Sequence, residues 1–190
     1  MLAHGAGTAM DTPFMAIVAE GVAAARIRVL RFEFPYMSKR SRINERRPPD
    51  PEPILVDCWR TAFAAAGKGQ TVIGGKSMGG RMASLVADEL DAIGLMCLGY
   101  PFHPPGKPGR PRTECLQSLR TTSVFVQGEP DPIGMPLEIE NYDLSAVVRI
   151  HWIIDGNHDL NPRKKSGRTL EQNMAEAVAA ITVFLDKLSS

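Results

Sequence analysis

Short apolar runs alternate with longer segments of helical periodicity along this chain. The runs that predict strands cover residues 1–3, 27–32, 70–73, 93–98, 123–126 and 147–152. The segments with helical spacing or helix-start signals cover residues 13–25, 53–66, 81–88, 116–120, 135–139 and 169–188. Strands that alternate with helices predict an α/β protein, with a mostly parallel central sheet and helices on both of its faces.

Some of these elements can be assigned to the core in more detail. Residues 93–98 are apolar without interruption, as expected of a strand that is buried on both faces. The helix over 169–188 carries a stripe of apolar residues at helical spacing, which we interpret as core rather than as a cofactor site. The helix over 13–25 is expected to turn one face inward, and that face carries Phe14, Ile17, Val18 and Val22.

The composition is that of an ordinary globular chain. Its 190 residues, 44% hydrophobic and 23% charged, suffice for one full core, so we expect a single domain over residues 1–190. A formal net charge of +1 gives no global field that favours nucleic acid or an anionic membrane. No apolar run is long enough for a membrane span. Cys58, Cys97 and Cys115 show neither metal-ligand spacing nor a disulfide framework, which favours a reducing, cytoplasmic compartment.

The stretch 74–81, Gly-Gly-Lys-Ser-Met-Gly-Gly-Arg, sets a serine between a predicted strand and a predicted helix. Its G-x-S-x-G core has the strand–turn–helix context that a nucleophile elbow requires. The flanking glycines leave room for the neighbouring strand and helix, where any Cβ would collide. Ser77 is therefore the candidate nucleophile, and the N–H of Met78 is a candidate oxyanion donor. A glycine-rich turn with an ordinary serine is the alternative.

The chain begins with an apolar strand that runs into His4-Gly5-Ala6-Gly7. His-Gly-x-Gly after a strand is the pattern of the loop that supplies a second oxyanion N–H to a nucleophile elbow. We therefore predict the Ala6 N–H as the second donor, and His4 and Gly5 as substrate-binding residues. A glycine loop with a structural histidine is the alternative.

Two loops that follow later strands carry a candidate acid and a candidate base. Asp131 comes just past a buried strand between two prolines, which suits the acid that orients a catalytic histidine, and Glu129 is its near competitor. His158 lies in the loop after the last strand and is the candidate base. His103, in a proline-rich segment, is its competitor, whereas His151 lies inside a strand and is expected to be a packed or surface residue.

Three further segments are candidates for substrate contacts. The loop after residues 93–98 follows the carboxyl end of a strand, where ligands bind in open α/β sheets. We expect it to wall the substrate pocket with Tyr100, Pro101, Phe102 and His103. The basic segments 38–47 and 163–168 are either anion-attracting rims or solvated loops, and both interpretations stay open.

Ser77, Asp131 and His158 follow one another in the order nucleophile, acid, base, which is the α/β-hydrolase order. The whole chain resembles the small dienelactone-hydrolase-like α/β-hydrolases, a group related to testis-expressed hydrolase-like proteins and to a regulatory subunit of the non-specific lethal complex. The most specific mark is Tyr-Pro-x-His-Pro-Pro-Gly at 100–106; the other matching segments are 2–7, 31–36, 74–81, 126–134 and 156–168. The resemblance implies the α/β-hydrolase fold with a minimal cap, a serine nucleophile, and neither a metal nor an organic cofactor.

Two features depart from that family's pattern. The loop of His4 follows the third strand in α/β-hydrolases, yet only three residues precede it here, so the early strands are absent from this start or dispensed with. A sheet edge left open in this way can be covered by a second copy of the chain, which makes a homodimer an expectation. Glu129-Pro130 stands where such loops often carry a basic residue before the aspartate.

We therefore expect a serine hydrolase, carboxylesterase-like or thioesterase-like, that acts on a small or medium acyl substrate. His158 would accept the Ser77 proton, Asp131 would orient His158, and water would release the acyl group. A non-catalytic scaffold or binding protein that retains the fold is the alternative from another class. Nucleic-acid binding through the two basic segments is a third hypothesis, which the net charge supports little.

Overall fold

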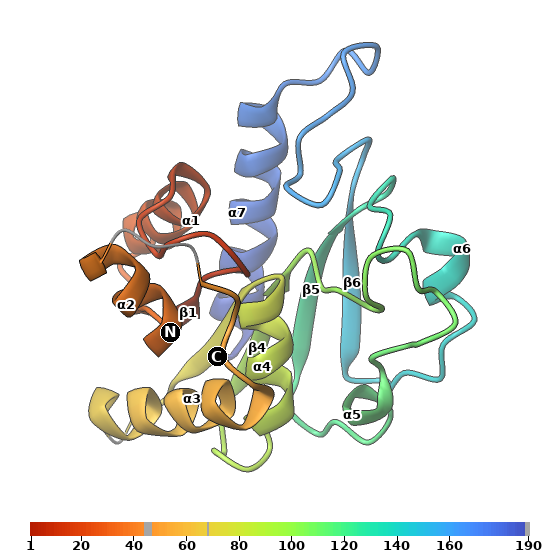
Figure 1. The fold of residues 1–190 in the computed structure, drawn as a ribbon. Helices are drawn as coiled ribbons and strands as arrows, with labels where there is room; N and C mark the ends of the chain where they lie inside the picture. The colour runs from red at the N-terminus through yellow and green to blue at the C-terminus, as the bar shows by residue number, and fades with distance from the viewer. Residues whose placement is uncertain (44–46, 68, 189–190) are drawn as a thin grey trace.

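The computed structural model describes residues 1–43, 47–67 and 69–188, which form one sheet of six parallel strands in the order β2-β1-β3-β4-β5-β6 (Figure 1). The strands are β1 (Leu2–Ala3), β2 (Arg31–Phe32), β3 (Val72–Lys76), β4 (Gly94–Leu98), β5 (Ser123–Gly128) and β6 (Val148–Ile153). The helices are α1 (Pro13–Ala24), α2 (Pro35–Ile43), α3 (Glu52–Ala66), α4 (Met78–Val86), α5 (Glu114–Gln117), α6 (Pro136–Ile139) and α7 (Leu170–Leu188). The predicted α/β architecture is confirmed.

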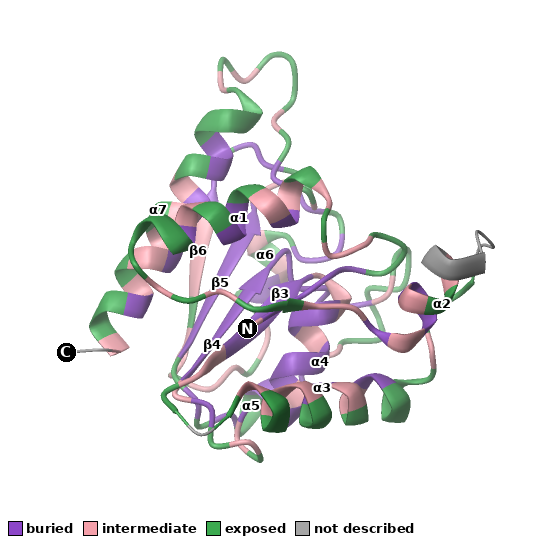
Figure 2. Cartoon of the chain, turned by 90° about the vertical axis from the view of Figure 1, so that its left-hand side faces the viewer, coloured by how far each residue is buried: buried purple, intermediate pink, exposed green. Residues whose placement is uncertain are grey.

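Helices cover both faces of the sheet (Figures 1 and 2). Successive side chains of a strand point to opposite faces, so the apolar run of β4 serves two cores. Leu95 and Cys97 pack with the buried residues of α3 and α4, whereas Met96 and Leu98 pack with those of α1 and α7. As predicted, residues 93–98 are apolar without interruption because the strand is buried on both faces.

The first strand lies inside the sheet although it is only two residues long. β1 pairs with β2 on one side and with β3 on the other, so the loop that follows it emerges next to the end of β3. The strand predicted over 27–32 is shorter than expected and covers only Arg31–Phe32. Its ladder is limited by the length of β1, and the side chains of Ile27 and Val29 pack instead against the core that α1 and α7 share.

The structure corrects two assignments near the N-terminus. The buried face of α1 carries Met15, Val18, Ala19 and Val22, whereas Ile17 is 44% exposed. The segment predicted as a basic loop, 38–47, is helical as far as residue 43, and Glu45 and Arg46 lie outside the described residues. A helix forms here because Tyr36 and Met37 are buried and because Asp50 accepts a hydrogen bond (2.8 Å) from the Tyr36 N–H in the first turn.

Among the described residues, no helix combines the length and the apolar character that crossing a bilayer demands. The longest helix, α7, carries buried apolar residues on one face and charged residues elsewhere, as a helix packed on a sheet does.

Candidate active site

Ser77 occupies a strained turn between β3 and α4. Its backbone has φ 49° and ψ −115°, in a region that residues other than glycine rarely adopt. The turn is held on both sides: the Ser77 N–H donates to the carbonyl of Leu98 (2.9 Å), and the Ser77 carbonyl accepts from the N–H of Arg81 (3.0 Å). The side chain thus stands at the carboxyl edge of the sheet, as a nucleophile elbow requires.

Gly75 and Gly79 allow the backbone of β1 to pass close to this turn. A Cβ on Gly75 would lie 2.2 Å from the carbonyl oxygen of Ala3, and one on Gly79 would lie 2.5 Å from the same atom. Both distances are far shorter than a carbon–oxygen contact. Any side chain at these two positions would collide with β1, as the sequence predicted. Because both residues are glycine, the loop after β1 lies against the start of α4.

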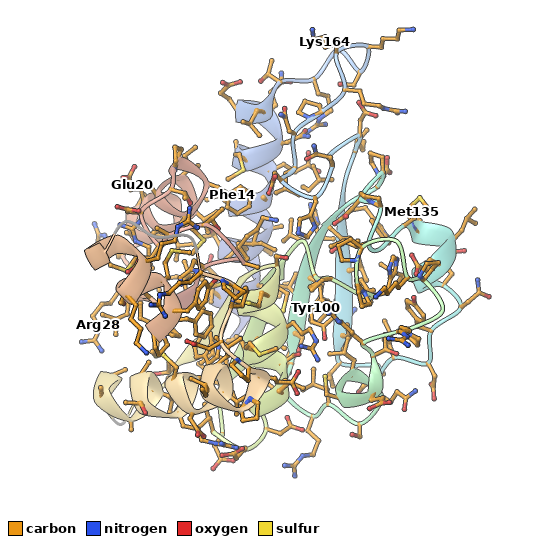
Figure 3. All side chains as sticks on the ribbon, in the orientation of Figure 1. Phe14, Glu20, Arg28, Tyr100, Met135 and Lys164 are labelled. Carbon is orange, nitrogen blue, oxygen red and sulfur yellow. The ribbon has the colours of Figure 1, made fainter. Side chains whose placement is uncertain are left out.

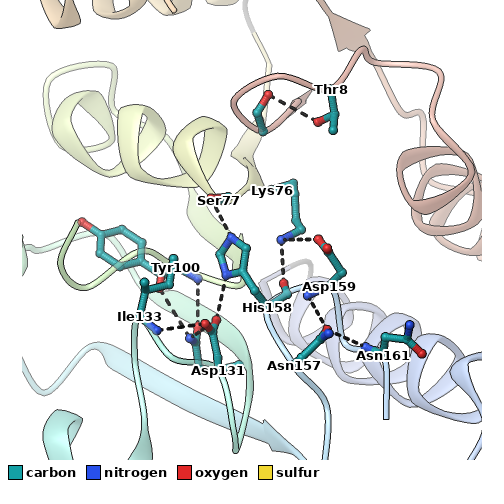
Figure 4. Close-up of polar contacts among 12 residues, drawn as sticks. Thr8, Lys76, Ser77, Tyr100, Asp131, Ile133, Asn157, His158, Asp159 and Asn161 are labelled. Atoms are coloured by element: carbon teal, nitrogen blue, oxygen red, sulfur yellow. Dashed lines mark hydrogen bonds and ion pairs between the residues drawn. The ribbon is translucent and has the colours of Figure 1, made fainter. Parts of the chain in front are cut away.

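A chain of hydrogen bonds joins Ser77, His158 and Asp131 (Figure 4). His158 Nδ1 lies 2.8 Å from Asp131 Oδ2, and His158 Nε2 lies 2.9 Å from Ser77 Oγ. A carboxylate can only accept, so Nδ1 carries the ring proton and Nε2 accepts from the serine hydroxyl. The three residues come from the end of β3, the loop after β5 and the loop after β6, and the structure brings them together as the sequence predicted.

Asp131 is completely buried and fully engaged. Its Oδ1 accepts from the N–H of Ile133 (3.1 Å), and its Oδ2 accepts from Nε2 of Gln127 (2.8 Å) as well as from His158. Gln127 in turn accepts the N–H of Tyr100 through Oε1 (2.8 Å), which links the carboxyl ends of β4 and β5. Sequence analysis missed Gln127, although a polar side chain inside the apolar run of β5 was the available signal.

The competing acid and base have other partners. The carboxylate of Glu129 accepts from the N–H of Asp155 (3.4 Å). The ring of His103 lies near the carbonyl of Pro104 (2.8 Å) and the carboxylate of Glu138 (3.1 Å). Both ring nitrogens of His103 are occupied in this way, and the imidazole that lies against Ser77 is that of His158.

The two predicted oxyanion donors come from two segments that flank the Ser77 turn. Met78 is the first residue of α4, and Ala6 is exposed in the turn that follows β1. Within the part of the chain that the structure describes, neither N–H donates to an acceptor. Both donors therefore remain available to a ligand, as an oxyanion site needs.

His4 supports this loop from below. It is fully buried: its Nδ1 donates to the carbonyl of Gly5 (2.8 Å), and its Nε2 accepts from the N–H of Phe34 (3.1 Å). Burial is the largest influence on its pKa and lowers it, so the neutral ring is favoured. His4 was predicted to bind substrate, but in this structure both ring nitrogens are used to fix the loop to the chain after β2. Gly5 is also buried.

The predicted pocket wall is part of the core instead. Tyr100 and Phe102 are fully buried, His103 is 2% exposed, and Pro101 is buried beside them. The Tyr100 ring stacks on that of Phe125, with centroids 4.9 Å apart. Large rings gain more by burial than by exposure, so the loop folds onto the sheet rather than standing up as a rim. None of these side chains presents a surface to a ligand in this structure.

The basic segments differ from one another. In α2, Arg40 donates to the carbonyl of Gly7 (3.1 Å), so this helix buttresses the loop of Ala6. In 163–168, Arg163 pairs with Asp155, and Arg168 pairs with Glu176. Lys164 is exposed at the end of a projecting loop (Figure 3). Among the described residues, no three His, Cys, Asp or Glu side chains gather in a way that would hold a metal ion.

The chain was found to be similar to a known protein family and to several solved structures. A family model described as an alpha/beta hydrolase domain matches residues 1–186. An α/β serine hydrolase homologue from Coxiella burnetii superposes with a TM-score of 0.70 at 14% identity, covering 97% of this chain and 84% of that one. A serine hydrolase without a lid from Xanthomonas campestris gives 0.67 at 16% identity, over 96% and 81%.

A dienelactone hydrolase from Anabaena variabilis gives a TM-score of 0.65 at 18% identity, over 94% of this chain and 82% of that one. At such identities a structural likeness shows the fold alone. The resemblance to dienelactone-hydrolase-like proteins is confirmed at that level, and the relation to testis-expressed hydrolase-like proteins stays a prediction.

Proposed function

Because this chain belongs to the alpha/beta hydrolase family, we propose that it is a serine hydrolase that cleaves a small or medium ester or thioester. One observation carries the proposal: the continuous hydrogen-bond chain from Ser77 through His158 to Asp131. A serine hydroxyl is a weak nucleophile until an adjacent base takes its proton. Here His158 is that base, and Asp131 is the acid that orients it.

The proposed reaction proceeds through an acyl-enzyme. Ser77 Oγ attacks the substrate carbonyl carbon while its proton passes to Nε2 of His158, and the N–H groups of Met78 and Ala6 stabilise the oxyanion. As the tetrahedral intermediate collapses, the leaving oxygen or sulfur takes the proton from His158 and departs as an alcohol or a thiol. Water then repeats the sequence on the acyl-Ser77 ester, so that a carboxylic acid leaves and the serine is restored. Asp131 holds Nδ1–H and stabilises the imidazolium that forms at each stage.

The connections above the sheet support a site that is open to compact substrates. The segment between β4 and β5 contains only the short helix α5, and the segment between β5 and β6 contains only α6 (Figure 1). Neither connection adds a helical layer over Ser77. The relatives of this fold include a serine hydrolase without a lid and a dienelactone hydrolase. A substrate with a small acyl group and a good leaving group fits this arrangement best.

Labelling by a fluorophosphonate probe tests the proposal directly. The probe should label the wild type, should not label Ser77→Ala, and should label His158→Gln far more slowly, because the serine needs its base. With p-nitrophenyl acetate and a short acyl thioester, Ser77→Ala should lower kcat by at least about 1,000-fold. If a folded wild type neither reacts with the probe nor hydrolyses any ester, the hydrolase assignment is wrong and the scaffold alternative takes its place.

A further inference from the structure

Lys76 is a buried cation that stands directly before Ser77. It is the last residue of β3, and its side chain is only 8% exposed. It is the one Lys or Arg among the buried polar residues of the described chain. Burial lowers its pKa, while Asp159 and Asp131 act in the opposite direction. A buried ammonium group persists only where charges and hydrogen bonds replace its lost hydration.

Those replacements all belong to the neighbourhood of His158. Nζ of Lys76 donates to the carbonyl oxygen of His158 (2.6 Å) and forms an ion pair with the carboxylate of Asp159 (3.1 Å; Figure 4). The ammonium group also lies 5.4 Å from the centre of the Phe14 ring, which α1 contributes. Lys76 therefore binds the backbone of the same residue whose ring lies against Ser77.

The stem of Lys76 touches the opposite side of the site. A Cβ on Gly5 would lie 3.4 Å from Cγ of Lys76, so the aliphatic chain packs along the loop that carries Ala6. The side chain thus spans from the proposed oxyanion loop to the His158 loop. Both ends of this span are within one residue of a group that the proposed reaction uses.

The other contacts of the His158 loop reach α7 and the loop after β5, or stay within the loop. The carbonyl of Leu160 accepts from Nδ2 of Asn173 (2.8 Å), and the N–H of Asp155 donates to the carboxylate of Glu129 (3.4 Å). Oδ1 of Asn157 accepts from the N–H groups of Asp159 (2.9 Å) and Asn161 (3.0 Å), and Gly156 bridges to Pro162. These bonds shape the loop, but they do not connect it to the nucleophile turn. Besides the hydrogen bond between His158 and Ser77, Lys76 connects the backbone of this loop to the nucleophile turn, because it is covalently next to Ser77.

The charges around the His158 ring also involve Lys76. The ring faces Asp131 from the loop after β5 and the neutral Ser77 from the turn before α4. The ammonium group of Lys76, which β3 contributes, binds the carbonyl oxygen of His158. Its counter-ion is Asp159, from the same loop as His158. A nearby cation disfavours protonation of an imidazole, and a nearby carboxylate favours it.

We propose that Lys76 is a positioning residue for the reaction of this site: its ammonium group fixes the His158 loop against the Ser77 turn and, balanced by Asp159, sets the charge around the His158 ring. The inference rests on the proposed function and assigns it a fourth side chain. It predicts two separate effects of replacing Lys76. One concerns the titration of the ring, and the other concerns the rate of the reaction.

The titration is measured by NMR on the His158 ring, whose signals are assigned by their loss in His158→Gln. Lys76→Met keeps a similar stem and removes the charge, so the titration midpoint should lie above that of the wild type. Asp159→Asn, at a side chain that is 72% exposed, removes the counter-ion of Lys76 and should move the midpoint downward. Lys187→Met, which removes the same charge at the exposed end of α7, should leave the midpoint unchanged.

Kinetics with p-nitrophenyl acetate complete the test. Lys76→Met should lower kcat by roughly 10-fold to 100-fold with little change in KM, because a misplaced base slows the chemical step. The proposal is overturned if the titration midpoints of Lys76→Met and Asp159→Asn match that of Lys187→Met, or if Lys76→Met keeps the wild-type kcat. A wild type that hydrolyses no ester would instead refute the proposed function, and the NMR titration would still decide whether Lys76 governs the ring.

Discussion

Gln127 donates a hydrogen bond to Oδ2 of Asp131, the same carboxylate oxygen that accepts from His158. Both side chains are fully buried, and only three residues separate them along the chain. A buried carboxylate needs its lone pairs satisfied, and it needs a fixed orientation if it is to hold an imidazole in one tautomer. Gln127 meets both needs and also carries the N–H of Tyr100.

Gln127→Leu keeps a similar side-chain volume but removes the hydrogen bonds of the amide to Asp131, Tyr100 and Gly134. We expect the unfolding free energy to fall by about 1–3 kcal/mol, because the Tyr100 N–H loses its acceptor in the interior. The kcat for p-nitrophenyl acetate should fall by about 10-fold as Asp131 becomes less constrained. Gln117→Leu, at an exposed position of α5, is the matched control for urea denaturation and kinetics. Equal stability and kcat in the two variants would contradict this role.

The left-handed backbone of Ser77 predicts an unusual order of stability among its variants. Ser77→Gly and Ser77→Ala both delete the hydroxyl, but only glycine adopts a φ of 49° without strain. We expect the glycine variant to be more stable than the alanine variant by about 1 kcal/mol in urea denaturation. The same pair at Ser118, where φ is −110°, should show no advantage for glycine. An alanine variant that equals the glycine variant at position 77 would rule out strain in the turn.

Much of this arrangement could be predicted from sequence because its signals are local. The strand–turn–helix around Ser77 is specified by neighbouring residues, and the apolar runs of β4 and β5 need burial on both faces whatever surrounds them. Ser77, Asp131 and His158 each follow a predicted strand. Because parallel strands end at the same edge of a sheet, the three loops could be expected to meet there.

The errors concern residues whose environment is set by distant partners. Tyr100 was expected in the wall of the substrate pocket, but it is fully buried and its ring stacks on that of Phe125. The charged residues of 38–43 favoured a loop, yet burial of Tyr36 on one side suffices for a helix. A polar residue in the apolar run of β5 was a local signal, but the backbone partner of Gln127 is Tyr100, 27 residues away, so its role could not be predicted from neighbouring residues.

Gly79 is the position where the site depends most directly on close packing of backbone. In Gly79→Ala the new Cβ would lie 2.5 Å from the carbonyl of Ala3 and 2.6 Å from that of His4. Backbone atoms cannot move aside cheaply, so we expect a loss of about 2–4 kcal/mol in unfolding free energy. Reactivity toward the fluorophosphonate probe should fall as well, since the loop of Ala6 must shift. Gly109→Ala, where a Cβ meets nothing within 4 Å, should be neutral in both assays.

Asp88 predicts how the stability of the fold depends on pH. Burial alone would raise the pKa of its carboxyl, but hydrogen bonds from the side chain and N–H of Thr121 and from the N–H of Arg120 outweigh that and lower it below 3.8. Because the folded-state pKa lies below the unfolded-state value, the stabilisation is complete above pH 3.8. It is lost as pH falls through the folded-state pKa.

Asp88→Asn should therefore lower the unfolding free energy at pH 7, and the difference from wild type should shrink as the pH is lowered from about 4 to 2. Urea denaturation at a series of pH values measures this difference. Asp143→Asn, at an exposed carboxylate, serves as the control and should show little dependence on pH. If the Asp88→Asn difference stayed constant down to pH 2, or grew as the solution became more acidic, the hydrogen bonds at the end of α4 would not favour the charged carboxylate.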